Sequence, residues 1–536
     1  MLFKPFNKAG LFMTPAYGTR LRRIAIRGAG LLLSAETITY LVSLVSVSIL
    51  ARILVPSDFG LVAIVTTFSG FLATLTKIGF PEAILQRRDM SHRLATNVFW
   101  INIALTIALT LAFAASGPLL ANLYHDPRII RVSALASLSI IFTGASMVHG
   151  ALLDRGMCFS AGATNAVVGR LAAAVVAIVF ALAGCGYWAL VAGVVAQPLA
   201  LFVGAWFLCR WTPGLPRRAV GTGSLLSFAI HLSGTANVNY WTRNFDNVLV
   251  GWRFGSASLG LYKKAYDLFA LPANQLFSMF PVAVSTLSRL VKDPPQYRRY
   301  FLSGLSSVAI VGMGVAGAMT LIGRDVVRII LGPRWDAAGS IFTFFAPGIG
   351  ILLMYKSVTM IHLSLGTTGR LFRWTILEVA VTAPLFFLGL RWGPTGVAAA
   401  WTASFCILIL PAFQYAGSPI QLEISAVIRS TWRFVAASLL AGCACALVIR
   451  FIGPLADLPG WSGALVRAIV TSVLFGALYV GSIILVHGGY APLRILAGVM
   501  QDMISWKKPP TVTPPVTEDA SEREAVPSAS LAGSAP

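Results

Sequence analysis

The segment GAGLLLSAETITYLVSLVSVSIL, residues 28–50, is apolar along its length and carries a single charged residue, Glu36. An α-helix rises about 1.5 Å per residue and the hydrocarbon core of a bilayer is roughly 30 Å thick, so about 20 apolar residues cross it. We therefore predict a membrane-spanning helix. Because the segment follows a basic leader and lacks an obvious small-residue cleavage site, we expect it to stay as an anchor.

Similar apolar segments recur along the chain. Hydrophobic residues make up 57% of it and charged residues 11%, which is too apolar for a soluble core, so the excess must face lipid. The predicted fold is all-α, a polytopic membrane helix bundle of about fourteen helices. After residues 28–50 these cover 59–79, 97–116, 132–153, 165–183, 187–208, 225–251, 258–284, 301–321, 338–365, 371–390, 397–413, 434–451 and 464–486.

The net charge of +22 predicts a topology. Lys and Arg are spread over the connectors and do not gather with aromatic residues on a soluble face, so we expect no nucleic-acid partner. Alternate connectors carry about 26 of them on the side of the N-terminus and about 9 opposite, which by the positive-inside rule places both termini in the cytoplasm of a bacterial inner membrane. The main clusters are Arg20, Arg22, Arg23 and Arg27, then Arg87, Arg88 and Arg93, then Arg217 and Arg218, then Arg298 and Arg299.

The sequence predicts no metal site, no cofactor and no enzymatic domain. Its six cysteines lie in or beside apolar segments without the paired spacing of metal ligands, and its six histidines are scattered. The longest connector is about 15 to 20 residues, too short for an inserted soluble domain. Any function must therefore be carried out within the helix bundle.

An internal repeat appears at an offset of about 200 residues, and its matches keep their order. Predicted spans one to six then correspond to spans seven to twelve, and because each set is even in number, both enter the membrane in the same orientation. The matches are Gly60–Leu61 with Gly260–Leu261, Phe80, Pro81 and Ala83 with Phe280, Pro281 and Ala283, and Gly169–Leu171 with Gly369–Leu371.

This repeat divides the chain into five expected parts. Residues 1–27 form a cytoplasmic N-terminal segment, 28–222 and 223–430 form two six-helix lobes related by a pseudo-two-fold along the membrane normal, and 431–487 add two helices. Residues 488–536 are expected to begin with a cytoplasmic amphipathic surface helix and to continue as a disordered tail rich in Pro, Ser, Thr and Glu.

Charged residues inside the predicted spans are the candidate site. A charge at the bilayer centre costs about 2.5 to 3.5 kcal/mol, so each one requires a partner, a wet cavity or a role. Asn239, Arg243 and Asp246 are spaced by four and three residues and are predicted to share one helix stripe, and Lys263 and Asp267 are spaced to pair. Each charged pair could instead be an ion pair that only locks helices together.

Three further charges lie in other predicted spans: Glu36 in the first, Lys77 near the cytoplasmic end of the second and Lys356 in the tenth. Lys77 could extend to the headgroups instead of facing a cavity. Cations in a cavity suit an anionic headgroup such as a diphosphate, since Lys and Arg supply charge-assisted donors to phosphate oxygens. The acidic members could carry a coupling proton or cation.

Three segments resemble the Wzx-like polysaccharide flippases of the multidrug, oligosaccharidyl-lipid and polysaccharide exporter superfamily, particularly the branch of colanic acid and succinoglycan exporters. The resemblance extends over the first twelve predicted spans, with weaker support from GYWALVAG at 186–193 and GPTGVAAAW at 393–401. The three segments are ARILVPSDFGLVAI at 51–64, IGFPEAILQRR at 78–88 and RNFDNVLVGWRFGSASLGLYKKAYDLFALPANQ at 243–275.

The resemblance implies a two-lobe transporter that moves undecaprenyl-diphosphate-linked oligosaccharide repeat units from the cytoplasmic to the periplasmic leaflet by alternating access, for exopolysaccharide or lipopolysaccharide synthesis. Arg243, Asp246 and Lys263 match the family pattern of charges in the seventh and eighth spans. The expected partners are the lipid-linked oligosaccharide, membrane lipid and a polysaccharide polymerase with its export machinery.

Other functions stay open from the sequence alone. A multidrug cation exporter of the same superfamily predicts an acidic, aromatic cavity, whereas the deep charges here include at least as many Lys and Arg as Asp and Glu. A membrane-embedded glycan polymerase or ligase predicts a large extracytoplasmic loop, and the outer connectors are too short for one. A non-transporting scaffold gives no reason to keep charges at depth.

Overall fold

The computed structural model describes residues 3–13, 21–77, 79–87, 90–216, 222–277, 280–451 and 458–490, together with Arg494 and Gly498. The chain divides into two compact units, Met1–Val486 and His487–Pro536. The predicted amphipathic segment and tail belong to the second unit and lie almost entirely outside the described residues.

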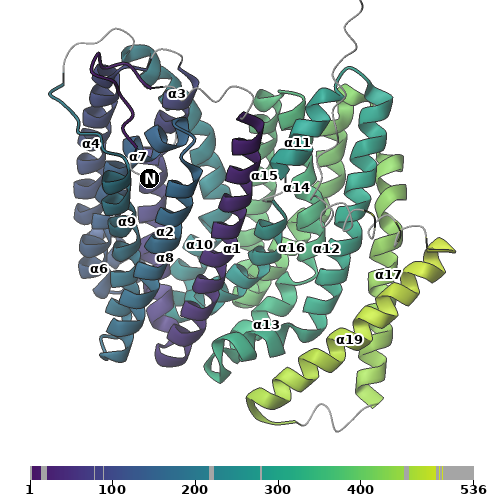
Figure 1. Cartoon of the computed structure of the whole chain (residues 1–536). Coiled ribbons are helices and arrows are strands. Elements are labelled where there is room, and N and C mark those ends of the chain that lie inside the picture. Colours follow the sequence, from purple (N-terminus) through teal and green to yellow (C-terminus); the bar gives the residue numbers. More distant parts are fainter. Residues whose placement is uncertain are drawn as a thin grey trace, which may run out of the picture. The chain divides into compact units, whose positions relative to one another are not determined.

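Helices account for nearly all of the first unit (Figure 1). Its first half contains α1 (Leu21–Ile53), α2 (Pro56–Lys77), α3 (Phe80–Gln86), α4 (His92–Ala115), α5 (Gly117–Tyr124), α6 (Arg128–Ala136), α7 (Leu138–Arg155), α8 (Phe159–Leu182) and α9 (Tyr187–Leu208). Its second half contains α10 (Thr222–Phe277), α11 (Phe280–Arg289), α12 (Pro294–Leu331), α13 (Asp336–Phe345), α14 (Gly348–Ser364), α15 (Thr368–Gly389), α16 (Gly393–Gly417), α17 (Ile424–Phe451) and α19 (Gly460–His487).

The all-α membrane prediction is confirmed, but the count of fourteen spans is not. The described residues contain ten helical stretches long and apolar enough to cross a membrane, or up to eleven if the pair Pro333–Phe345 and Gly348–Ser364, bent by 52°, is one span. Two local differences reduce the count. Helices α15 and α16 qualify together as the single stretch Thr368–Ile420, and α10, which carries the predicted seventh and eighth spans, is not among the ten.

Helix α10 continues through the connector that was expected between those two spans. Its backbone leaves helical geometry at Gly255, where φ is +78° and ψ is 179°. A side chain rarely tolerates this φ value, so glycine permits the bend that separates the two halves of the helix. The polar residues that identified the candidate site lie on both sides of the bend.

The apolar surface of the helices agrees with a lipid environment. In α1 only 11% of an apolar 18-residue window within Gly30–Ile53 is buried within the protein, and the exposed side chains of the helix include Leu31, Leu41 and Val45. A soluble protein does not present so continuous an apolar face to water. The helix begins at Leu21, before the predicted start at residue 28.

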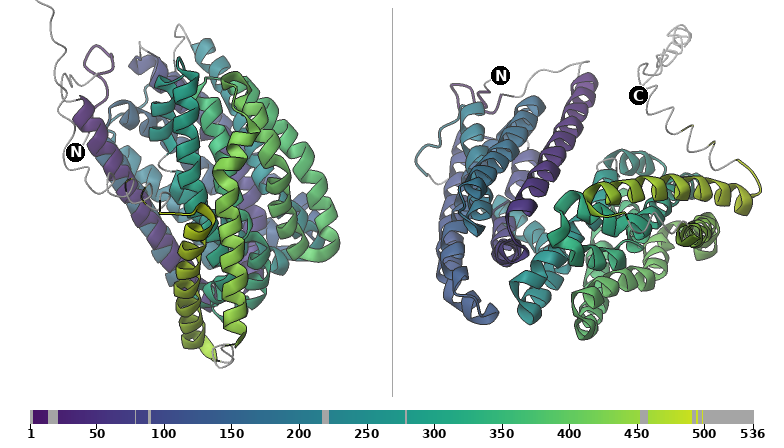
Figure 2. Two further views of the ribbon diagram at one scale, coloured as in Figure 1. Left: turned by 90° about the vertical axis from the view of Figure 1, so that its right-hand side faces the viewer. Right: turned by 90° about the horizontal axis from the view of Figure 1, so that it is seen from below.

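The two halves of the first unit meet most extensively where α10 packs against α2. Figure 2 shows the helices of the first half grouped on one side and those of the second half on the other. At the contact Gly60 lies against Gly260, and a side chain on either glycine would overlap a backbone carbonyl of the opposite helix. Close approach of backbones through small residues is typical of packed membrane helices.

The C-terminal end of α1 contacts the C-terminal end of α12 and the turn after it, which joins the two halves at one end of the bundle. Ser48 donates a hydrogen bond to the carbonyl of Ile330 at 2.6 Å, and the indole Nε1 of Trp335 donates to the carbonyl of Ala51 at 2.9 Å. The ring of Phe59 on α2 packs edge-on against Trp335 with 5.1 Å between centroids. We call the contacts of Ala51, Phe59 and Trp335 the closed end.

Candidate functional site

A cavity of about 300 Å³ lies among α10, α14 and α16. It is near the lower limit of the size of ligand pockets. Three cationic side chains and one acidic side chain line it, so its formal charge is positive. The lining residues are Arg243, Asn244, Lys263, Tyr266, Asp267, Phe269, Ala270, Leu352, Lys356 and Trp401.

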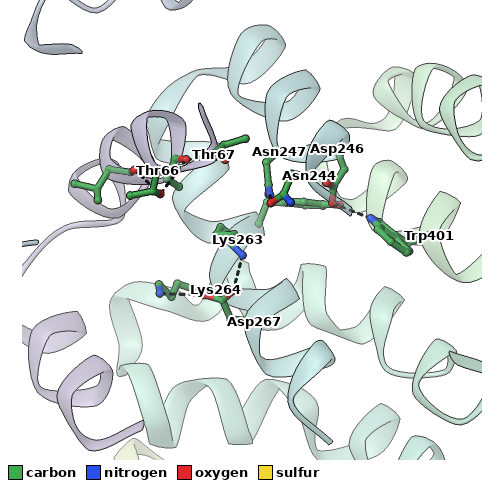
Figure 3. A network of polar contacts seen from close by, with 12 residues as sticks. Thr66, Thr67, Asn244, Asp246, Asn247, Lys263, Lys264, Asp267 and Trp401 are labelled. Atoms are coloured by element: carbon green, nitrogen blue, oxygen red, sulfur yellow. Dashed lines mark hydrogen bonds and ion pairs between the residues drawn. The ribbon is translucent and has the colours of Figure 1, made fainter. Parts of the chain in front are cut away.

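Lys263, Lys264 and Asp267 form an ion-pair cluster on the second half of α10. Lys263 Nζ lies 2.7 Å from Asp267 Oδ1, and Lys264 Nζ lies 3.1 Å from Asp267 Oδ2. The two lysines approach the carboxylate from different directions (Figure 3). The predicted spacing of Lys263 and Asp267 thus forms an ion pair, and Lys264 joins it, so two ammonium groups share one carboxylate.

Asp246 is completely buried and is held by two neutral donors. Tyr262 donates its hydroxyl to Oδ2 at 2.7 Å, and Trp401 donates its indole N–H to the same oxygen at 2.8 Å. The carboxylate therefore joins the two halves of α10 to α16. A buried polar group requires such partners, since a buried acceptor without one costs about 1 to 3 kcal/mol.

Arg243 is exposed, whereas Asp246, one turn further along α10, is buried. The Nε of Arg243 donates to Asn239 Oδ1 at 3.3 Å, and in the described part of the chain Arg243 forms no ion pair with Asp246. Asn239, Arg243 and Asp246 lie in the regular first half of α10 and share one stripe as predicted, but the carboxylate of Asp246 bonds to Tyr262 and Trp401 and not to Arg243. Arg243 instead reaches the cavity together with Lys263 and Lys356.

Glu36 is the one predicted residue whose described side chain does not join this group. Glu36 is exposed on α1 and is absent from the cavity lining. Lys77 ends α2, but its side chain lies outside the described residues. The structure thus brings together Arg243, Lys263, Asp267 and Lys356 in one cavity, with Asn239 and Asp246 beside it.

Aromatic residues complete the site, and spacing rules did not identify them. Trp401 lines the cavity and Tyr266 lies beneath the ammonium of Lys263, 5.1 Å from Nζ to the ring centroid. The only sequence signal for Trp401 was its place at the end of GPTGVAAAW. Next to Lys356, Tyr355 accepts a hydrogen bond from the indole of Trp374 at 2.8 Å and donates to Glu378 at 2.9 Å.

The sequence of this chain matches a known protein family over more than half of its length. Residues 49–340 match the family model described as polysaccharide biosynthesis protein. The chain belongs to this family. The predicted resemblance to polysaccharide exporters is thereby confirmed, and the matched region includes both α2 and α10.

Two similar proteins have names that refer to the synthesis or transport of polysaccharides. The succinoglycan biosynthesis transport protein ExoT of Rhizobium meliloti (strain 1021) is 24% identical over 69% of this chain and 74% of that protein. The lipopolysaccharide biosynthesis protein WzxC of Escherichia coli (strain K12) is 24% identical over 59% of this chain and 65% of that protein.

Solved structures show the same fold at low sequence identity. The lipid II flippase MurJ in an inward closed conformation aligns with a TM-score of 0.65 at 13% identity, covering 84% of this chain and 99% of that chain. An inward-facing multidrug resistance MATE family transporter of the MOP superfamily aligns with a TM-score of 0.56 at 15% identity, covering 75% and 99%. These identities relate the architectures and carry no residue roles.

Proposed function

We propose that this family member is a flippase that moves oligosaccharide units linked to undecaprenyl diphosphate from the cytoplasmic to the periplasmic leaflet by alternating access. The observation that carries the proposal is the positively charged cavity between α10, α14 and α16. Arg243, Lys263 and Lys356 can donate charge-assisted hydrogen bonds to phosphate oxygens. The names of the relatives, which refer to succinoglycan transport, lipopolysaccharide synthesis and lipid II flipping, support the same class of substrate.

The cavity contains residues suited to the diphosphate and residues suited to the sugar next to it. The cations suit the diphosphate, while Tyr266 and Trp401 offer aromatic surface beside them. Aromatic rings present apolar faces and a polar edge, which is suited to sugars that alternate C–H and O–H groups. We propose that the diphosphate contacts Arg243, Lys263 and Lys356 and that the first sugar lies near Trp401.

We further propose that the bundle consists of two duplicated lobes, 28–222 and 223–430, followed by 431–487. The reciprocal contact of Gly60 with Gly260 supports this, as do α3 and α11, which both begin with Phe-Pro at positions 80 and 280. The third match gives less support, because Arg170 lies well inside α8 whereas Arg370 lies in the first turn of α15.

The orientation follows from the basic connectors and is also a proposal. With both termini cytoplasmic in the inner membrane, the closed end faces the periplasm. The bundle would then be closed on its periplasmic side, where the transported unit is released. A polysaccharide polymerase and export machinery would take up the product on that side.

The multidrug alternative is not favoured. A cavity lined by Arg243, Lys263 and Lys356 repels a cationic drug, and its one acidic lining residue, Asp267, is already paired with two lysines. The same positive charge attracts an anionic substrate. The sign of the cavity therefore separates these two transport functions.

Accumulation of lipid-linked repeat units on the cytoplasmic face tests the proposal. A strain depleted of this protein is expected to accumulate them, and the wild-type chain is expected to clear them. The variant Lys263→Ala should fail to do so at equal abundance, whereas Lys292→Ala, which changes an exposed lysine between α11 and α12, should succeed. Normal surface glycan and no accumulated intermediate in the depleted strain would contradict the proposal.

A further inference from the structure

Asp267 connects two lysines that have different surroundings. Lys263 lines the cavity, where a substrate anion can reach it, but Lys264 is not among the lining residues. The ammonium of Lys264 instead lies over the ring of Phe59 on α2, 5.0 Å from its centroid. One carboxylate therefore touches both the proposed substrate site and a contact between the two halves of the protein.

The ring beneath Lys264 belongs to the closed end. Phe59 is buried and packs edge-on against Trp335, whose indole donates to the carbonyl of Ala51. A cation over an aromatic face is attracted by the ring quadrupole, most strongly where water is excluded. The side chain of Lys264 is 15% exposed, so this attraction acts largely out of water.

We propose that Lys264 is a positioning residue that couples occupancy of the cavity to the closed end through Asp267. When a substrate phosphate binds Lys263, it competes with Asp267 for that ammonium group, and like charge repels the carboxylate from the phosphate. Asp267 then pairs with Lys264 alone and draws its ammonium away from Phe59. The contact between α2 and α10 is thereby weakened when substrate is present.

This inference rests on the proposed function for the identity of the anion, but its central contact can be tested without substrate. Lys264→Met removes the charge and keeps an apolar side chain of similar length. We expect it to loosen the closed end in the empty protein. Lys264→Arg keeps a cation over Phe59 and should leave that end closed.

The six native cysteines are replaced by serine, Ala51→Cys is introduced as the only thiol, and the protein is reconstituted in liposomes. The quantity measured is the rate at which this thiol is labelled. Ala51 is fully buried, so an impermeant maleimide reacts only when the closed end opens. Lys264→Met should raise the labelling rate at least fivefold, and Lys264→Arg and the distant Lys292→Met should not. Equal rates for Lys264→Met and its parent, with both proteins monodisperse after extraction, would overturn the inference.

A second arm separates this inference from the proposed function. Undecaprenyl diphosphate added to the liposomes should raise the labelling rate of the parent protein but not that of Asp267→Asn, which lacks the connecting carboxylate. If the lipid acts equally on both, the coupling through Asp267 is wrong and the substrate class stands. If the lipid acts on neither while Lys264→Met labels faster, the contact at Phe59 stands and the proposed substrate is wrong.

Discussion

Gly60 on α2 and Gly260 on α10 contact each other reciprocally. A Cβ atom on Gly60 would overlap the carbonyl oxygen of Ser256 and lie 2.9 Å from the nitrogen of Gly260. A Cβ atom on Gly260 would overlap the carbonyl oxygen of Pro56 and lie 3.0 Å from the nitrogen of Gly60. Gly60 and Gly260 are separated by the repeat offset of about 200 residues, and so are Pro56 and Ser256. The contact of Gly60 with Ser256 therefore repeats as the contact of Gly260 with Pro56, as expected for two segments related by a two-fold axis.

Alanine at either glycine is therefore expected to destabilise the bundle to a similar degree. The added methyl group meets a backbone atom, which cannot rotate away, so α2 and α10 must separate. We expect Gly60→Ala and Gly260→Ala each to cost about 1 to 3 kcal/mol, the usual range for overpacking, and to lower the midpoint of thermal unfolding in detergent.

Gly304→Ala on α12 is the matched control, because nothing lies within 4 Å of its Cβ position. This change should be neutral, or stabilising by about 0.5 to 1 kcal/mol, since alanine favours a helix over glycine. A normal midpoint for Gly60→Ala would show that the helices do not approach as closely as described.

Removal of Arg243 is expected to abolish export, and removal of Asp246 is not expected to rescue it. Arg243 lines the cavity and bonds to Asn239, whereas Asp246 is held by Tyr262 and Trp401. Arg243→Ala alone and Arg243→Ala with Asp246→Ala should therefore both fail. Surface glycan is measured beside membrane abundance, because the change at Asp246 also leaves two buried donors without their acceptor. Recovery of export in the double variant would mean that the two residues pair in a functional state.

These residues show how far the sequence could lead. Lys263 and Asp267 are one helical turn apart, so their ion pair follows from local geometry alone. The partners of Asp246 are 16 and 155 residues away, and no periodicity predicts which of several aromatic residues folds back onto a carboxylate. The apolar segments likewise predicted where helices form, but not that α10 would pass through its expected connector with only a bend at Gly255.

A cysteine at Gly214 tests the orientation. This residue is exposed in the connector after α9, and the nearest side-chain atom to its Cβ position is 3.5 Å away, an ordinary contact. With both termini cytoplasmic, a permeant maleimide should label Gly214→Cys in intact cells and an impermeant one should not. Labelling by the impermeant reagent in intact cells would show that Gly214 faces the periplasm and that the predicted orientation is wrong.

Lys356 tests whether the charge of the cavity itself is required. It lines the cavity from α14, opposite Arg243 and Lys263 on α10. If these cations hold a diphosphate, Lys356→Gln should lower export at least tenfold, whereas Lys356→Arg should retain much of it, because a second cation preserves the charge although its planar group bonds differently. Export is quantified as surface glycan per molecule of protein in the membrane. Equal export by the Gln and Arg variants would mean that Lys356 is a bystander and that recognition depends on the remaining cations and the aromatic residues of the cavity.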